Sequence, residues 1–431
     1  QLLLETVPGS EVIAVGIWFL NGSRDEGPLE EGFSHFIEHM LFKGTERLTP
    51  YSIACDIDRV GGSINAFTER EVTAVHTTVP RDYFRHVFEI MCEICFASIF
   101  PEDELAKEQQ VILNEISSSE DSPEENAFDI FMESLWPDHA LSKKIMGTKK
   151  SIQAVKRERL VAFYRSYFVP KNCIISVAGG INADQANSFI EETLLRFAVV
   201  ETSQNSEFGK KRIPPKATGF KRFVEGSWNQ AQVYFGTQFA KPAKGKDYYT
   251  QLLLSTAFGE SMSGRLFQEI REKQGLCYSI SSYRTYYSDA GFWMIYANTL
   301  PDSVRALLEG IQQELGRLFS DPVTGKELED AKMQIKGSLI LAKQDMEVRM
   351  KRMTRQFLAM EQILTYQECF ELIDSVCLDD IVQSTSQILG NPDSGLLVYG
   401  CKGLKKLAKI PFCFSGPALL ESSKIQPKQS K

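Results

Sequence analysis

The sequence predicts an α+β protein built from two similar α/β sandwich domains in tandem. The first half opens with an apolar strand, continues through helices and a hairpin, and closes on another strand and a helix. The second half repeats this order. At 431 residues, the chain is also too long to form a single domain around one hydrophobic core, since domains of about 100 to 200 residues are usual. We therefore expect a duplicated unit.

The first half begins with an apolar run at residues 12–20 that ends in a turn, Asn21-Gly22-Ser23. A Gly61-Gly62 turn then precedes a hairpin with a charged tip. The expected elements are a strand at 12–20, a helix at 31–43, hairpin strands at 63–68 and 72–79, helices within 82–119 and at 125–136 and 151–167, a strand at 173–178 and a helix at 183–198.

Residues 201–219 form a polar run that contains Pro214-Pro215 and has little periodicity, which is typical of a linker. It separates a predicted first domain, 1–200, from a second, 220–414. Residues 415–431 are expected to be a disordered tail. The second-half elements are a strand at 231–239, helices at 248–258 and 265–273, a hairpin at 279–298, helices within 302–360 and 365–389, and a strand at 395–399.

Composition narrows the function classes. An apolar fraction of 43% with 24% charged residues is ordinary for a globular protein. The net charge of −8 argues against nucleic acid and fits cationic or unfolded polypeptide partners better. No stretch is long and apolar enough to span a membrane. No signal peptide is visible, although the start at Gln1 leaves a short leading segment open.

The nine cysteines are odd in number and irregularly spaced, which indicates a reducing compartment. We expect a bacterial cytoplasmic location, with the mitochondrial matrix as the alternative. Cys92 and Cys95 form a CxxC pattern, which can bind metal or act in redox chemistry, but they lie in an apolar helical segment. We interpret them as buried hydrophobic residues.

The candidate metal motif is His35-Phe36-Ile37-Glu38-His39. Helix positions i, i+3 and i+4 share a face, so both imidazoles and the carboxylate lie together. Two imidazoles at this spacing can bind one Zn²⁺. Glu38 can take a proton from water activated by the metal and return it to a leaving amine. The alternative is two unrelated histidines, yet two of only five histidines fall in this window, and HxxEH is the inverzincin signature.

A catalytic zinc needs a third protein ligand and an open position for water. Glu115 is the best candidate, and Glu108, seven residues earlier, shares nearly the same helix face and suits a supporting role. By local pattern alone, the alternative that both are solvated surface carboxylates is favoured.

Longer motifs make the family recognisable. They are Gly22-Ser23-Arg24-Asp25-Glu26, the run from Gly32 to Thr45, the run from Gly61 to Thr68, and the run from Ile270 to Tyr278. With these motifs the chain resembles the M16 (pitrilysin/insulinase-like) zinc metallopeptidases, specifically the M16B group of mitochondrial processing peptidase, its beta subunit and its bacterial relatives. The resemblance covers essentially the whole chain and implies domains of the LuxS/MPP-like metallohydrolase type.

The resemblance implies roles for further residues. The third ligand of the family lies 76 positions after the second histidine, which is Glu115 here, with Glu108 as its upstream partner. An edge strand carrying Asn65, Ala66 and Phe67 is expected to bind extended substrate by backbone hydrogen bonds. In the second half, Arg271 and Tyr278 are expected to bind the substrate carbonyl and stabilise its oxyanion.

The processing peptidases also imply a substrate pocket. Glu125 and Asp129 match the acidic residues that receive a substrate arginine, and Phe42 matches the aromatic residue for the position after the cleaved bond. The stretch 259–264 has fewer glycines than the loop of the non-catalytic processing subunit. His76 stands where the family often has an aromatic residue, and we interpret it as strand packing rather than a ligand.

The sequence therefore predicts a zinc endopeptidase with one Zn²⁺ per chain that cleaves extended peptides or unfolded precursor segments. Because one chain carries both motif sets, we expect a homodimer whose two sites are each completed in trans. The alternatives are a non-catalytic core or chaperone-like protein of the same fold and the non-catalytic partner subunit of a heterodimer. Loss of a metal ligand would mark the first, and the second would be expected to lack His35, Glu38 or His39.

Overall fold

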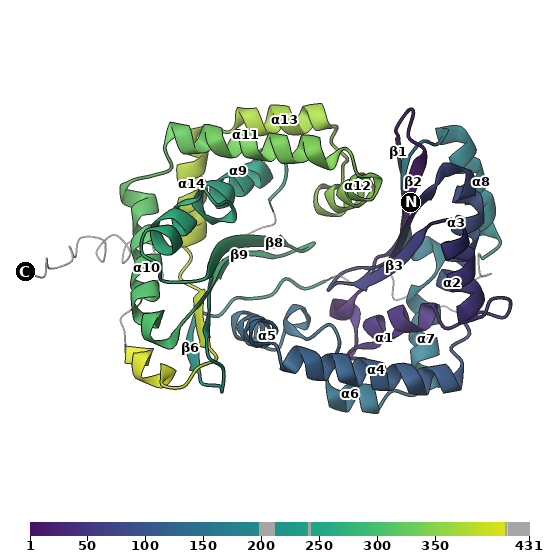
Figure 1. Cartoon of the computed structure of the whole chain (residues 1–431), viewed down its shortest axis with the longest axis horizontal. Helices are drawn as coiled ribbons and strands as arrows, with labels where there is room; N and C mark the ends of the chain where they lie inside the picture. Colours follow the sequence, from purple (N-terminus) through teal and green to yellow (C-terminus); the bar gives the residue numbers. More distant parts are fainter. Residues whose placement is uncertain (198–211, 240–242, 410–411, 413–431) are drawn as a thin grey trace, which may run out of the picture. The chain divides into compact units, whose positions relative to one another are not determined.

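The computed structural model describes residues 1–197, 212–239, 243–409 and 412. Within these residues it contains two five-stranded sheets, with helices packed on both faces of each (Figure 1). The mixed helix and sheet content agrees with the predicted two-domain α+β fold. Residues 201–211 of the predicted linker and the predicted tail at 415–431 lie outside the described residues.

The first sheet has the strand order β1-β5-β2-β4-β3. The strands are β1 (Leu2–Thr6), β2 (Val12–Phe19), β3 (Ser63–Thr68), β4 (Thr73–Pro80) and β5 (Cys173–Gly179). β1 runs parallel to β5, and the other neighbours are antiparallel. Among the described strands β3 pairs only with β4, so β3 forms an edge of the sheet.

The second sheet repeats this topology in the order β6-β10-β7-β9-β8. Its strands are β6 (Phe220–Val224), β7 (Ala231–Gln238), β8 (Ser279–Tyr286), β9 (Gly291–Thr299) and β10 (Ser394–Tyr399). Again the first strand is parallel to the last, and a hairpin forms the opposite edge. The predicted duplication is therefore present at the level of strand order.

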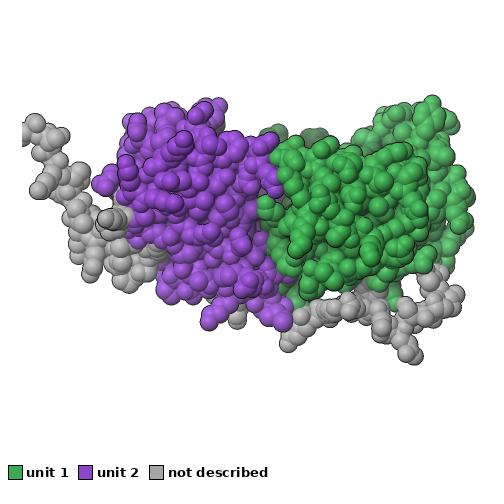
Figure 2. Space-filling model, turned by 90° about the horizontal axis from the view of Figure 1, so that it is seen from below, with its two compact units in different colours: residues 1–118, 143–212, 341–363 green, residues 119–142, 213–340, 364–431 purple. Residues whose placement is uncertain are grey.

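The chain divides into two compact units, shown in green and purple in Figure 2. Unit 1 comprises residues 1–118, 143–212 and 341–363, and unit 2 comprises residues 119–142, 213–340 and 364–431. The domain boundaries drawn from the sequence, 1–200, 201–219 and 220–414, remain a prediction. The division into compact units shows in addition that each half of the chain contributes one segment to the unit formed mainly by the other half.

The helices of unit 1 are α1 (Phe33–Leu41), α2 (Pro50–Arg59), α3 (Phe84–Phe96), most of α4 (Glu102–Glu120), α6 (Lys149–Gln153), α7 (Arg157–Tyr167), α8 (Ala183–Leu195) and α12 (Met346–Met360). Those of unit 2 are α5 (Pro123–Leu135), α9 (Lys246–Ser255), α10 (Val304–Ser320), most of α11 (Gly325–Ala342), α13 (Tyr366–Ser375) and α14 (Leu378–Leu389), with the π-helical turns η5 (Thr256–Glu260) and η6 (Phe267–Glu272).

Two helices are exchanged between the halves. In unit 1, α12 covers the face of the first sheet opposite α3 and α8 (Figure 1). Its Met346, Met350 and Met353 are buried in one cluster with Trp18. In unit 2, α5 packs on β7 and β10, and the Phe131 ring lies 5.8 Å from that of Tyr234. Both faces of each sheet are thus covered, which explains the nearly continuous apolar character of β2 and β5.

Several details differ from the sequence-based expectation. β1 and β6 were not predicted, because both are short edge strands with mixed exposure that pair with a strand far along the chain. The single helix expected at 151–167 is two helices, α6 and α7. The segment expected as a helix at 265–273 contains a π-helical turn. Cys92 and Cys95 are fully buried, as expected for core residues.

From the sequence, no segment was expected to span a membrane. None of the helices that the structure describes combines the length and the apolar composition required to cross a bilayer.

Candidate metal centre

Helix α1 presents the HxxEH side chains because its other faces are anchored in the core. Five apolar side chains of this helix are at most 2% exposed, namely those of Phe33, Phe36, Ile37, Met40 and Leu41. The remaining face carries His35, Glu38 and His39, which are partly exposed. The helix predicted at 31–43 is therefore present as α1, and it holds both imidazoles on one side, one turn apart.

The start of α1 is fixed by a glycine and a buried carboxylate. Gly32 has φ +91°, and a Cβ there would come within 2.7 Å of Ile152 and of the Met146 carbonyl. Glycine has no side chain that could cap the helix, so Glu26 supplies the acceptor. The Glu26 carboxylate accepts the N–H of Gly32 at 2.8 Å and that of Ser34 at 2.7 Å. Burial raises the pKa of Glu26 to about 8, although these two N–H groups favour the charged form.

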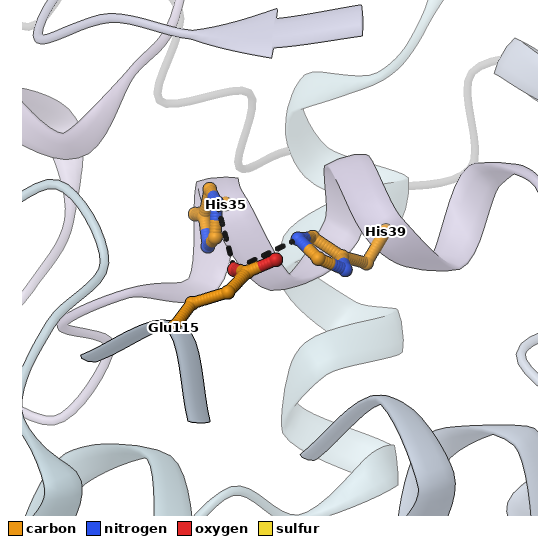
Figure 3. A group of neighbouring side chains, drawn as sticks. All are labelled: His35, His39 and Glu115. Carbon is orange, nitrogen blue, oxygen red and sulfur yellow. Dashed lines mark ion pairs between the residues drawn. The ribbon is translucent and has the colours of Figure 1, made fainter. Parts of the chain in front are cut away.

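Glu115 on α4 approaches both histidines of α1. Its Oε2 lies 3.8 Å from His35 Nε2 and 3.4 Å from His39 Nε2, and one ligand atom from each residue lies within 4.8 Å of the others. Figure 3 shows the carboxylate between the two imidazoles. The core packing of Ile112 and Ile116 on the inner face of α4 directs Glu115 to this position. Among the described residues, this is the only such group of histidine, cysteine and acidic side chains.

Glu108 contacts His39 on the side of the imidazole that faces away from Glu115. One of its oxygens is 2.9 Å from His39 Nδ1, and the other is 2.7 Å from Lys43 Nζ. The Glu108 side chain is only 8% exposed. Although burial opposes ionisation, the bonds from Lys43 and His39 hold the pKa of Glu108 below its usual value. With Nδ1 protonated, His39 donates to Glu108 and keeps the lone pair of Nε2 available.

Glu38 has its own hydrogen-bond donor. The Thr68 hydroxyl, at the end of β3, donates to Glu38 Oε2 at 2.6 Å. Burial raises the pKa of Glu38, and the bond from Thr68 partly opposes this. A carboxylate with a raised pKa beside a candidate metal centre is suited to accept and return a proton.

The donor set fits a zinc ion. Two imidazole nitrogens and one carboxylate oxygen are the ligand types of catalytic zinc sites, which leave a further position open. Burial, together with the neighbouring His39, lowers the pKa of His35 to about 4, so its imidazole is neutral at pH 7, as a ligand must be. The Glu115 side chain is 42% exposed, so solvent reaches the group from that side.

A cavity of about 280 Å³ lies beside the group. It is lined by Glu38, His39, Phe42, Lys43, Ile64, Asn65, Ala66 and Glu108. Three of the residues expected to bind substrate, Phe42, Asn65 and Ala66, thus lie with Glu38 and His39 in one hollow. Phe67, also expected to bind substrate, packs elsewhere: its ring is 5.3 Å from that of Trp18 and 5.4 Å from Lys351 Nζ.

The other predicted site residues belong to unit 2. Arg271 lies on η6, with its guanidinium 4.4 Å from the Phe267 ring centre and 5.9 Å from that of Tyr278. Tyr278, just before β8, is 76% exposed. Glu125 and Asp129 are one turn apart on α5, with Glu125 in the first turn. His76 is buried on β4 beside Glu347, in agreement with its predicted packing role.

Three residues near the group were not singled out from the sequence: Glu26, Lys43 and Thr68. Each stands in a motif quoted above. Their contacts cross from one element to another, so the motifs gave no sign of their partners.

Fold and site together describe a two-domain α+β protein whose candidate metal centre consists of two imidazoles and a carboxylate. Residues 1–149 match the family model described as "Insulinase (Peptidase family M16)", and residues 154–335 match "Peptidase M16 inactive domain". An "Uncharacterized zinc protease" of Bacillus subtilis is 32% identical over 389 residues, which cover 88% of this chain and 91% of the relative. A zinc protease of Rickettsia felis, also termed uncharacterized, is 31% identical over 92% of this chain and 94% of its own length.

A solved structure, of a protease from Helicobacter pylori, has the same fold. It superposes with a TM-score of 0.85 at 21% identity, covering 93% of this chain and 96% of the other. The chain therefore belongs to the M16 peptidase family.

Proposed function

We propose that this protein is a zinc-dependent endopeptidase that holds one Zn²⁺ per chain on His35, His39 and Glu115. The observation that carries the proposal is the convergence of these three ligand atoms within 4.8 Å of one another, with Glu38 on the same helix face. Family membership and the names of the relatives support a protease activity. When bound, the zinc would supply Lewis-acid activation of a water and of the peptide carbonyl.

Glu38 is the proposed general base and acid. It takes the proton of the attacking water and returns it to the departing amine, for which its raised pKa is suited. Arg271 and Tyr278 are proposed to bind the substrate carbonyl oxygen and stabilise the negative charge that develops on it. Glu108 is proposed to orient His39 through Nδ1.

The proposed substrate is an extended peptide or an unfolded precursor segment. Support comes from the edge position of β3, since an edge strand offers backbone N–H and C=O groups to an added strand. Asn65, Ala66 and Phe67 are proposed to form this edge. Phe42 is proposed to contact the residue after the cleaved bond, and Glu125 with Asp129 to receive a substrate arginine.

We further propose a homodimer in which each site is completed in trans by Arg271 and Tyr278 of the partner. The test mixes a Glu38→Gln chain with a chain carrying Arg271→Ala and Tyr278→Phe. In mixed dimers one site regains both motif sets, so activity should exceed that of either parent. Mixed dimers that are no more active than their parents would show that the trans arrangement is wrong.

The activity itself is tested by cleavage of an unstructured peptide with an internal fluorophore and quencher. The wild-type protein should cleave it, lose activity with a chelator and recover with added Zn²⁺. Glu38→Gln should bind Zn²⁺ but cleave at least about 100-fold more slowly, since a positioned acid–base group contributes about 10² to 10⁴. Equal rates for the two proteins would contradict the mechanism.

A second candidate is a non-catalytic core, chaperone-like or partner protein of the same fold. The observation that favours this candidate is the name of the family model that matches residues 154–335, "Peptidase M16 inactive domain". Binding of unfolded peptide without chelator-sensitive cleavage would favour it. For the cellular location, we propose the bacterial cytoplasm, with the mitochondrial matrix as the alternative.

A further inference from the structure

Lys43 forms the outer end of a line of three side chains that leads to the candidate metal centre. Its Nζ lies 2.7 Å from Glu108 Oε1, and Glu108 Oε2 lies 2.9 Å from His39 Nδ1. His39 Nε2, on the other side of the ring, faces Glu115 at 3.4 Å. Lys43 is 26% exposed and Glu108 only 8%, so the contact is largely shielded from solvent.

The two histidines are held in different ways. His39 has a partner on Nδ1, whereas His35 Nδ1 is buried without a hydrogen-bond partner in the described structure. Of the two histidines, His39 is therefore the one whose ring orientation is fixed by a hydrogen bond to another side chain, that of Glu108. A partner on Nδ1 sets the tautomer and raises the basicity of Nε2 toward a metal.

Glu108 can fill this role only if its charge is compensated. A carboxylate that is nearly buried is costly unless it is paired. Lys43 provides the pairing cation, and its position is set by the end of α1, two residues after Leu41. A cation is also favourable there because the carboxyl end of a helix carries partial negative charge.

We propose that Lys43 is a positioning residue that raises the zinc affinity of the site through Glu108 and His39. The inference rests on the zinc site of the proposed function, but not on peptide cleavage. Without the ammonium group, Glu108 loses its compensating charge and holds the His39 tautomer less firmly. The ligand atom Nε2 is then less well prepared for the metal.

The test measures the Zn²⁺ dissociation constant by competition with a chromophoric chelator, without substrate. Lys43→Met should weaken binding about tenfold, the lower end of the 10- to 100-fold range for partners of metal-ligating histidines. Lys43→Arg should restore most of the affinity, because it keeps the charge and the donor. Lys107→Met is the matched control: Lys107 is next to Glu108 in sequence but pairs with Glu104 on the surface.

A double-mutant cycle separates this role from general packing. If Lys43 acts through Glu108, Lys43→Met should add nothing in a Glu108→Gln background. An equal loss in both backgrounds, or none in the wild-type background, would overturn the inference. If Lys43→Met does not fold, as judged by circular dichroism, Lys43→Gln replaces it in the same cycle. Failure of the wild-type protein itself to bind Zn²⁺ would instead refute the proposed function.

Discussion

The Thr68 hydroxyl donates a 2.6 Å hydrogen bond to Glu38 Oε2 and so ties the last residue of the edge strand β3 to the proposed general base on α1. The same hydroxyl lies 3.5 Å from the Ser34 carbonyl oxygen. One carboxylate oxygen of Glu38 is thereby engaged, and the other accepts no hydrogen bond from the residues that the structure describes. The strand proposed to bind substrate and the residue proposed to move the proton are directly connected.

Replacing Thr68 should therefore impair turnover more than binding. In Thr68→Val the side chain keeps its size but loses the donor, and the Glu38 carboxylate becomes free to rotate. We expect kcat to fall about tenfold, a modest part of the factor due to acid–base catalysis, with KM and zinc content little changed. Steady-state kinetics and metal analysis are the measurements. Thr68→Ser should retain activity; an equally slow Thr68→Ser, or a Thr68→Val with wild-type kcat, would contradict this role.

The buried carboxyl of Glu26 should make stability depend on pH. A carboxyl whose pKa is raised by folding binds its proton more tightly in the folded state. Its contribution is complete below about 4.5 and is lost as pH rises toward about 8. Across this window the slope of the free energy of unfolding approaches about −1.4 kcal/mol per pH unit for this group.

Glu26→Gln should remove that slope, because the amide resembles the neutral acid and does not titrate. Urea unfolding of zinc-free protein at pH 5, 6, 7 and 8 is the measurement, since bound metal adds its own pH dependence. Glu30→Gln is the control, as Glu30 also accepts an N–H in this loop but is 33% exposed. A slope shared by wild type and Glu26→Gln would show that Glu26 is not its source.

The exchanged helices predict where core mutations act. Phe131 on α5 is fully buried in unit 2, although it belongs to the first half of the chain. Phe131→Ala should cost about 3–5 kcal/mol and speed amide hydrogen exchange in β7 and β10. Met350→Ala on α12 should cost about 2–5 kcal/mol and act on β2 and β5 instead. The prediction is wrong if either variant loosens both sheets to the same extent.

Removing the metal should leave the fold intact. The ligands stand on α1 and α4, whose inner faces are anchored in the core of unit 1 by Phe36, Ile37 and Ile112. We expect chelated protein to keep its circular dichroism spectrum while losing cleavage. Tm should rise with added Zn²⁺, as expected for a ligand that binds only the folded state. A large loss of helical signal on chelation would mean that the metal holds the two helices together.

Much of the proposed site could be predicted because its spacing is local. His35, Glu38 and His39 share a helix face whatever surrounds them, and the strand at Ser63–Thr68 directly follows the Gly61-Gly62 turn. Glu115 is different, because local pattern alone left open whether it is a ligand or a solvated surface carboxylate. The resemblance favoured the ligand, and the packing of α4 places its carboxylate 3.4 Å from His39.

The sequence by itself determined the repeated order of strands and helices, the HxxEH face and the family motifs. The tertiary structure decided which helix covers which sheet, and it brought Glu26 to the start of α1, Thr68 to Glu38 and Lys43 to Glu108. The physical reason is the separation along the chain of the residues that interact. Helix and strand periodicities arise from neighbours a few residues apart, whereas these contacts require separate elements to pack around a shared core. α12 covers a sheet formed by the other half of the chain. Without this helix, the apolar face of that sheet would be exposed to water.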